Sequence, residues 1–207
     1  MEKPDNSVLV NVHVTPSDEV GDQCVKISQS LKSDGTMFVL DRESKFPHMT
    51  VFMFRVANDR VAEVVKAVEQ VVSNLKSFPC RHTGYFMTAG RYFEASYEKT
   101  PEFVGFHEEL ISALKDLRIN PGQPYEEGYF TPYTAKQQAN AKETGYDLAH
   151  GLFRPHVTLT RYFEGQVPEK DPQVSPVDMS FQLQEVCVYK ADDNGAVYEP
   201  LAKFFLG

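Results

Sequence analysis

The chain has 207 residues, of which 42% are hydrophobic and 24% are charged, a composition that predicts a globular protein with one large domain or two small halves. Its 21 basic and 29 acidic residues give a net charge of −8, which argues against long duplex DNA as a partner but allows a small anionic ligand in a locally neutral or basic cleft. The three cysteines are scattered, no apolar run approaches about 18 residues, and the N-terminus lacks the apolar core of a signal peptide. We therefore expect a reduced, cytoplasmic protein that does not enter a membrane.

The first third of the chain predicts strands alternating with helices. Residues 7–14 alternate between valine and other side chains, which predicts a strand with one apolar face. Apolar residues at helical spacing predict a helix within 17–35, where Gly35 is a natural stop. Two more strands are predicted at 36–41 and 45–54, and a stripe of valines predicts a helix over 58–77.

Two hairpins and one helix are predicted in the rest of the chain. Residues 84–98 predict a hairpin that turns at Ala89-Gly90, and a helix begins at Pro101 with Thr100 as its N-cap. The chain closes with strands at 180–190 and 196–205, because the intervening sequence ADDNG is a strong hairpin turn.

The segment 119–152 differs from its surroundings, because it is rich in Pro, Gly, Tyr and amides. It is long for a connection in a compact domain, so we expect a lid-like or substrate-binding loop that contains a short helix near 133–143. Its tyrosines offer flat surfaces on which a base could stack, and Tyr133 is the favoured candidate.

One pattern occurs twice, in FPHMTVFMF (46–54) and in RPHVTLTRYF (154–163): Pro, His, apolar, Thr, apolar. The two copies lie about half the chain apart, which indicates two similar halves that face each other. Because successive side chains of a strand point to opposite sides, His48 and Thr50 share one face. His156 and Thr158 do the same in the second copy, so two such strands side by side would point two imidazoles and two hydroxyls into one groove.

This set of side chains suits phosphoryl chemistry. Two histidines that titrate near neutral pH can divide acid–base work, and two hydroxyls can hold the non-bridging oxygens of a phosphodiester. No pair of carboxylates and no cluster with metal-ligand spacing accompanies the pattern, so we expect chemistry without a metal or cofactor. The competing interpretation, hydrogen-bonded strand-end histidines and threonines that merely favour strands, accounts for one copy better than for two.

With the first strand and the closing segment FQLQEVCVYKADDNGAVYEPLAKFFL, both motifs resemble the two-histidine (2H) phosphoesterase superfamily, which includes bacterial 2′-5′ RNA ligase-like proteins and cyclic phosphodiesterases. The resemblance implies a single α+β domain over 1–207, a pseudo-two-fold bilobal fold with antiparallel sheets backed by helices around a central groove. It also implies that His48 and His156 are the acid–base pair and that Thr50 and Thr158 hold the phosphate. The segment 119–152 does not resemble the short segment that is usual in the family, so the resemblance does not identify the substrate.

Two neighbouring residues compete for a place beside the second motif. Basic residues often follow this motif in the family, so Arg161 could neutralise the phosphate. Strict alternation, however, places Arg161 opposite His156 and places Tyr162 on the His156 face. Either a bulge turns Arg161 into the groove, or Tyr162 is the better substrate-binding residue.

Asn11 and His13 share one face of the first predicted strand. Both would contact substrate if that strand borders the groove. The alternative is a polar face turned to solvent.

The sequence thus predicts a metal-independent phosphodiesterase that acts on a 2′,3′-cyclic phosphate or a 2′-5′ phosphodiester. Its expected partner is a small nucleotide or short RNA, and its expected state is a monomer. Three alternatives remain: a non-catalytic nucleotide-binding module of the same fold, a 2′-5′ RNA ligase that runs the same site in reverse, and a metal-binding protein that uses the paired histidines.

Overall fold

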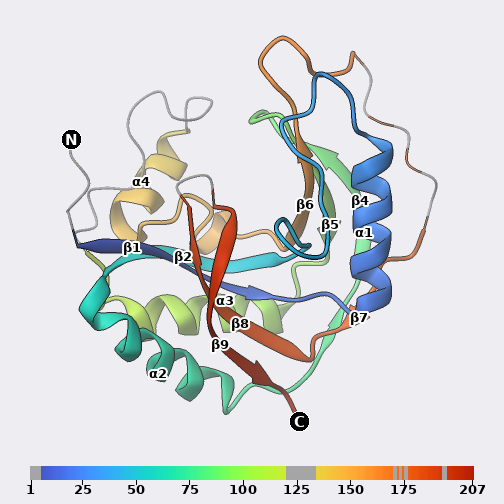
Figure 1. Ribbon diagram of the computed structural model, residues 1–207. Coiled ribbons are helices and arrows are strands. Elements are labelled where there is room, and N and C mark those ends of the chain that lie inside the picture. The colour runs from blue at the N-terminus through green and yellow to red at the C-terminus, as the bar shows by residue number, and fades with distance from the viewer. Residues whose placement is uncertain (1–5, 120–133, 170–171, 173, 175–176, 193–194) are drawn as a thin grey trace.

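The protein is bilobal, with one antiparallel sheet backed by two helices and another backed by one helix (Figure 1). The predicted α+β fold with a pseudo-two-fold arrangement is confirmed. No helix in the described part of the chain is long and apolar enough to cross a membrane. The computed structural model describes all residues except 1–5, 120–133, 170–171, 173, 175–176 and 193–194.

The first lobe is built on a four-stranded sheet. Its strands are, in spatial order, β2 (Met49–Ala57), β1 (Ser7–Val14), β8 (Glu185–Ala191) and β9 (Val197–Phe205). The helices α2 (Val61–Val72) and α3 (Pro101–Leu114) contact this sheet and cover one of its faces (Figure 1). β1 is buried on both faces and not on the valine face alone, because Phe46 and Met53 pack against the apolar cluster that contains Leu9 on its other face.

The second lobe is built on a three-stranded sheet with the order β4 (His82–Met87), β5 (Tyr92–Tyr97) and β6 (His156–Arg161). The helix α1 (Asp18–Ser30) contacts β6 and presents its apolar stripe to this sheet. The predicted hairpin turn at Ala89-Gly90 is confirmed. A short two-stranded sheet joins β3 (Pro79–Cys80) to β7 (Phe181–Gln182).

The predicted strand at 36–41 is wrong. Only an isolated bridge between Thr36 and Tyr162 forms there. The backbone amides of Leu40 and Asp41 do not pair with a neighbouring strand. Leu40 N donates to Ser28 Oγ, and Asp41 N donates to the carbonyl oxygen of Lys45. A run of apolar residues therefore crosses the lobe without pairing as a strand.

The segment 119–152 contains the predicted short helix, α4 (Ala135–Thr144). A reciprocal capping box begins it, in which the Thr134 hydroxyl accepts from Gln137 N while the Gln137 side chain accepts from Thr134 N. Tyr133 and the rest of the stretch 120–133 lie outside the described residues.

Candidate active site

Both histidine motifs reach one cavity because the edges of the two sheets meet. β2 is the outer strand of one sheet, β6 is the outer strand of the other, and the two strands contact each other. His48 directly precedes β2 and His156 opens β6. The cavity has a volume of about 610 Å³, and both histidines, Thr50 and Thr158 line it.

Strand alternation directs these side chains as the sequence predicts. Met49 and Val51 are fully buried in the core, as are Val157 and Leu159. The histidine and the threonine of each motif alternate with these core residues along the strand, so they must point to the other side, toward the cavity.

Each histidine is held by the same local hydrogen bond. The Nδ1 atom of His48 lies 3.1 Å from the carbonyl oxygen of Phe46, and the Nδ1 atom of His156 lies 2.8 Å from that of Arg154. Because a carbonyl oxygen only accepts, Nδ1 carries the proton of the neutral ring and Nε2 is left as the basic atom. The proline between each partner and its histidine fixes the extended backbone that closes this bond.

The environment of His48 favours its neutral form. Burial lowers the pKa of His48, the carbonyl of Phe46 partly opposes this, and the positive charge at His156 lowers the pKa further. At neutral pH the Nε2 atom of His48 is therefore available as a proton acceptor.

The Thr50 hydroxyl is oriented by Asn11, which lines the cavity from the neighbouring strand β1. Asn11 Nδ2 donates to Thr50 Oγ1 at 2.9 Å, so an acceptor position of that oxygen is filled and its own proton is left to be donated. Asn11 Oδ1 is buried and has no hydrogen-bond partner among the described residues. Asn11 therefore lies at the groove and is not turned to solvent.

His13 is not on the cavity wall. Its ring is fully buried, 5.1 Å from the ring of His48 and 5.0 Å from that of Tyr189, measured between ring centres. Burial, and then the charges of His48 and Lys203, hold its pKa well below 6.5. The expected contact between His13 and substrate is therefore corrected: the neighbouring rings cover His13, which packs behind His48 as a neutral group.

A bulge settles the competition between Arg161 and Tyr162. Glu94 and Phe93 are adjacent on β5, but they pair with Thr158 and Thr160, which are two positions apart on β6. The strand β6 therefore contains one extra residue at this point. The alternation reverses after this point, and Arg161 lines the cavity while Tyr162 is buried in the core. The expected position of Tyr162 on the His156 face is thus wrong, and Arg161 is the residue that lines the cavity.

Glu94 and Arg154 form an ion pair in the cavity that sequence reasoning missed. Glu94 is 2% exposed and accepts two hydrogen bonds from the Arg154 guanidinium. Its Oε1 atom also lies 3.6 Å from Nε2 of His156. The one signal in the sequence was a difference between the motif copies, because Arg154 stands two residues before His156 where Phe46 stands before His48.

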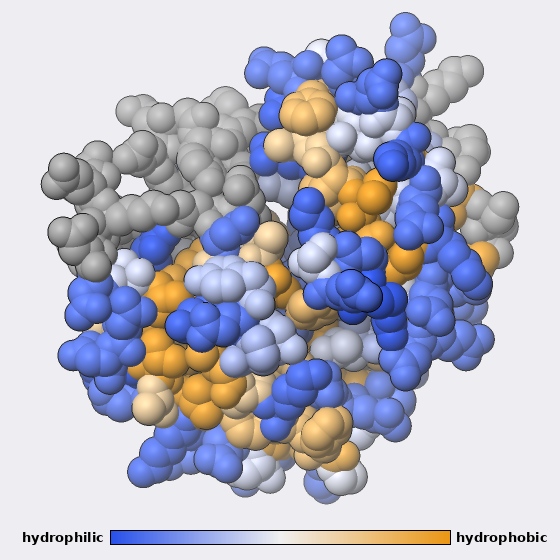
Figure 2. Space-filling model, in the orientation of Figure 1, coloured by the Kyte–Doolittle hydropathy of each residue, from blue (hydrophilic) through white to orange (hydrophobic). Residues whose placement is uncertain are grey.

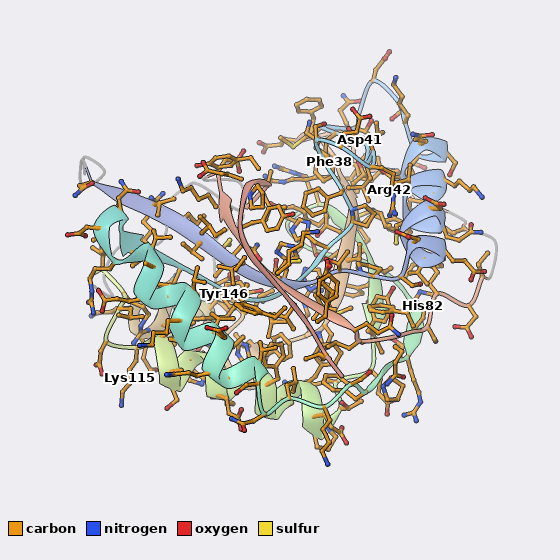
Figure 3. The ribbon with its side chains drawn as sticks, turned by 60° about the horizontal axis from the view of Figure 1, so that its bottom comes forward. Phe38, Asp41, Arg42, His82, Lys115 and Tyr146 are labelled. Atoms are coloured by element: carbon orange, nitrogen blue, oxygen red, sulfur yellow. The ribbon has the colours of Figure 1, made fainter. Side chains whose placement is uncertain are left out.

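Aromatic side chains complete the walls, and two of them are labelled in Figure 3. Phe38 comes from the connection that follows α1, and Tyr146 comes from the segment that follows α4 and packs edge-on against Phe52 of β2. Tyr146, one of the tyrosines of segment 119–152 considered as base platforms, lines the cavity, and so does Tyr92 of β5. Within the described ranges, no group of three His, Cys, Asp or Glu side chains could hold a metal ion.

Comparison with known proteins points to one family. A family model described as the 2′-5′ RNA ligase superfamily matches residues 16–195. No curated protein matches the chain in sequence.

Several solved structures are similar over nearly the whole chain. E. coli LigT complexed with phosphate has a TM-score of 0.59 at 12% identity, over 98% of this chain and 99% of its own. TT0787 of Thermus thermophilus has a TM-score of 0.61 at 19% identity, over 96% and 97%. E. coli LigT complexed with 3′-AMP has a TM-score of 0.59 at 14% identity, over 97% and 98%. At these identities the likeness shows a shared fold.

Proposed function

This chain belongs to the 2′-5′ RNA ligase superfamily, and on that premise we propose that it is a metal-independent phosphodiesterase. Its reaction is the opening of a 2′,3′-cyclic phosphate, or the cleavage of a 2′-5′ phosphodiester, in RNA or a nucleotide. The observation that supports this most is the cavity in which His48 and His156 expose Nε2 beside the hydroxyls of Thr50 and Thr158.

The geometry suits a displacement at phosphorus. In the hydrolysis of a cyclic phosphate, one Nε2 takes a proton from water as the new P–O bond forms. The other Nε2 gives a proton to the ribose oxygen as the old P–O bond breaks. Which histidine acts as the base and which as the acid depends on the P–O bond that is opened. Thr50, Thr158 and Arg161 are placed to hold the non-bridging oxygens, whose charge grows in the transition state.

A small nucleotide or the end of a short RNA is the proposed ligand. The LigT complexes with phosphate and with 3′-AMP support this choice by analogy of fold. Lys45 and Arg161 support it physically, because they place cationic groups on the wall of a cavity that three carboxylates also line, one of them paired with Arg154.

We expect EDTA to leave activity unchanged. The proposed steps use only imidazole, hydroxyl and guanidinium groups, so nothing in them requires a divalent ion. Initial rates on a 2′,3′-cyclic phosphate should agree before and after dialysis against EDTA. A loss that Mg²⁺, Mn²⁺ or Zn²⁺ restores would contradict the proposed mechanism.

We also expect the imidazole of His48 to titrate below pH 6.5. Burial lowers its pKa, and the charge of His156 lowers it further, so replacing His156 by Gln should raise the pKa of His48 toward 6.5. Titration of the histidine ring signals by NMR measures both values. If the pKa of His48 lies above 6.5 in the wild type, or is unchanged in His156→Gln, the two rings do not share one cavity as described.

A further inference from the structure

A buried histidine outside the cavity lies between the two catalytic motifs. The surface in Figure 2 carries polar and apolar side chains in mixture, whereas His107 of α3 is 0% exposed and does not line the cavity. A buried imidazole is costly unless its nitrogens find hydrogen-bond partners. The partners of His107 therefore show what this ring does in the fold.

Each nitrogen of His107 is bonded to the backbone beside a different motif. Its Nδ1 atom lies 2.7 Å from the carbonyl oxygen of Val51, the last residue of the first motif. Its Nε2 atom accepts from the backbone N–H of His150 at 3.0 Å. His150 begins the short segment that leads into β6 and the second motif. The ring thus bridges the first catalytic strand and the entry to the second.

The two backbone partners fix the proton on this ring. The carbonyl of Val51 only accepts and the amide of His150 only donates, so Nδ1 must carry the proton and Nε2 must be free to accept. Burial lowers the pKa of His107 to about 4, although the Val51 carbonyl and Glu108 oppose the shift. The ring is therefore neutral at neutral pH, and both bonds are made together.

The backbone that receives the bridge has an uncommon conformation. His150 has a φ of 54°, in the left-handed region that a residue with a Cβ seldom adopts. It opens the 3₁₀ helix His150–Leu152, and its Nδ1 atom lies 2.9 Å from Oε2 of Glu108, the neighbour of His107 on α3. Two adjacent side chains of α3 thus hold His150 in place.

A ring contact extends the bridge toward the second catalytic histidine. Phe153 stacks on His107, with ring centres 4.1 Å apart and an angle of 8° between the planes. Phe153 is buried and directly precedes Arg154, whose carbonyl oxygen lies 2.8 Å from Nδ1 of His156. Because a packed interior transmits displacements, a shift of His107 would reach His156 through this segment.

The two catalytic strands need such a bridge because they belong to different sheets. β2 and β6 contact each other, but β2 pairs within the first sheet and β6 within the second. Their relative position therefore depends on contacts other than strand pairing. His107 supplies one that involves backbone atoms on both sides.

We propose that His107 is a positioning residue that sets the separation of His48 and His156 by bridging the backbones of the two motifs. This inference rests on the proposed function, in which both imidazoles exchange protons at one phosphate. Proton transfer requires hydrogen-bond reach to the reacting oxygens, and a misplacement of about 1 Å costs about 10²-fold in rate.

Three substitutions at His107 test the bridge. His107→Phe keeps a flat ring against Phe153 but removes both hydrogen bonds, and we expect kcat on a 2′,3′-cyclic phosphate to fall about 10²-fold with little change in KM. His107→Asn retains a polar group near the Nδ1 position and His107→Gln retains one near the Nε2 position, so both should lose less. Circular dichroism identifies the variants that keep the fold, and Asn and Gln carry the test if the Phe variant does not.

Val68→Ala is the matched control. Val68 is also 0% exposed, but it lies on α2 and contacts neither motif through a hydrogen bond. Its truncation leaves a cavity in the core, so it should lower Tm and leave kcat unchanged. This control separates a loss of stability from a loss of positioning.

A measurement without turnover separates this inference from the proposed function. The charge at His156 lowers the pKa of His48, so the change in that pKa on His156→Gln reports how close the two rings lie. NMR titration should give a smaller change in a His107→Gln background than in the wild type, because the released strands lie farther apart. An unchanged value, or wild-type kcat in every folded His107 variant, overturns the inference. A smaller value in a protein whose wild type turns over no phosphodiester overturns the proposed function alone.

Discussion

Replacing His48 or His156 by Ala should each lower kcat by about 10²–10⁴-fold on a 2′,3′-cyclic phosphate. Each ring supplies one of the two proton transfers, and among the described residues no other imidazole lies on the cavity wall to take its place. The double variant should be little worse than either single variant, because groups that act as a unit are not additive. Steady-state rates on purified variants measure these losses.

His82→Ala is the matched control for both variants. His82 lies on β4 in the same lobe as His156 but does not line the cavity, so its removal should leave kcat near the wild-type value. Circular dichroism and thermal unfolding should show that both cavity variants keep the fold. A folded His48→Ala or His156→Ala variant with wild-type kcat would eliminate the two-histidine mechanism.

Replacing Thr50 or Thr158 by Val should each lower kcat by about 10²–10³-fold, the usual effect of losing one hydrogen bond to a developing oxyanion. Valine keeps the shape of threonine and removes only the hydroxyl. The Thr50 hydroxyl is directed by Asn11, whose amide fills an acceptor position of that oxygen and leaves its proton for the substrate.

The position of each hydroxyl in the reaction decides which constant changes. Removing a hydroxyl that holds the phosphate only in the transition state lowers kcat. Removing one that binds substrate and transition state equally raises KM and leaves kcat unchanged. Thr83→Val, on the exposed face of β4, is the control and should change neither constant. If kcat is retained in Thr50→Val and in Thr158→Val, these hydroxyls do not stabilise the transition state.

The parts of the site that depend on local alternation could be predicted from the sequence. His48 and Thr50 face the cavity, while Met49 and Val51 face the core, because a strand has a period of two residues. The pairing of this motif with its second copy followed from its repetition at half the chain length.

The parts that depend on register or on distant partners could not be predicted. An extra residue in β6 exchanged Arg161 with Tyr162, and no local pattern marks that bulge. Glu94 reaches Arg154 across 60 positions of the sequence, so only the fold shows the pair beside His156. His13 keeps the side of β1 that the sequence predicts, but packing of the aromatic rings around it hides it behind His48.

A single-turnover reaction, with products identified by mass, tests the central claim most directly. Excess wild-type protein is mixed in EDTA with an oligonucleotide that ends in a 2′,3′-cyclic phosphate, and in parallel with a 2′-5′-linked oligoadenylate. The account predicts metal-independent conversion of at least one of them, either by the gain of one water at the cyclic phosphate or by scission of the 2′-5′ bond. His48→Ala should convert it about 10²–10⁴-fold more slowly. Tight binding of both oligonucleotides without conversion of either would show instead that this cavity binds nucleotides and does not cleave them.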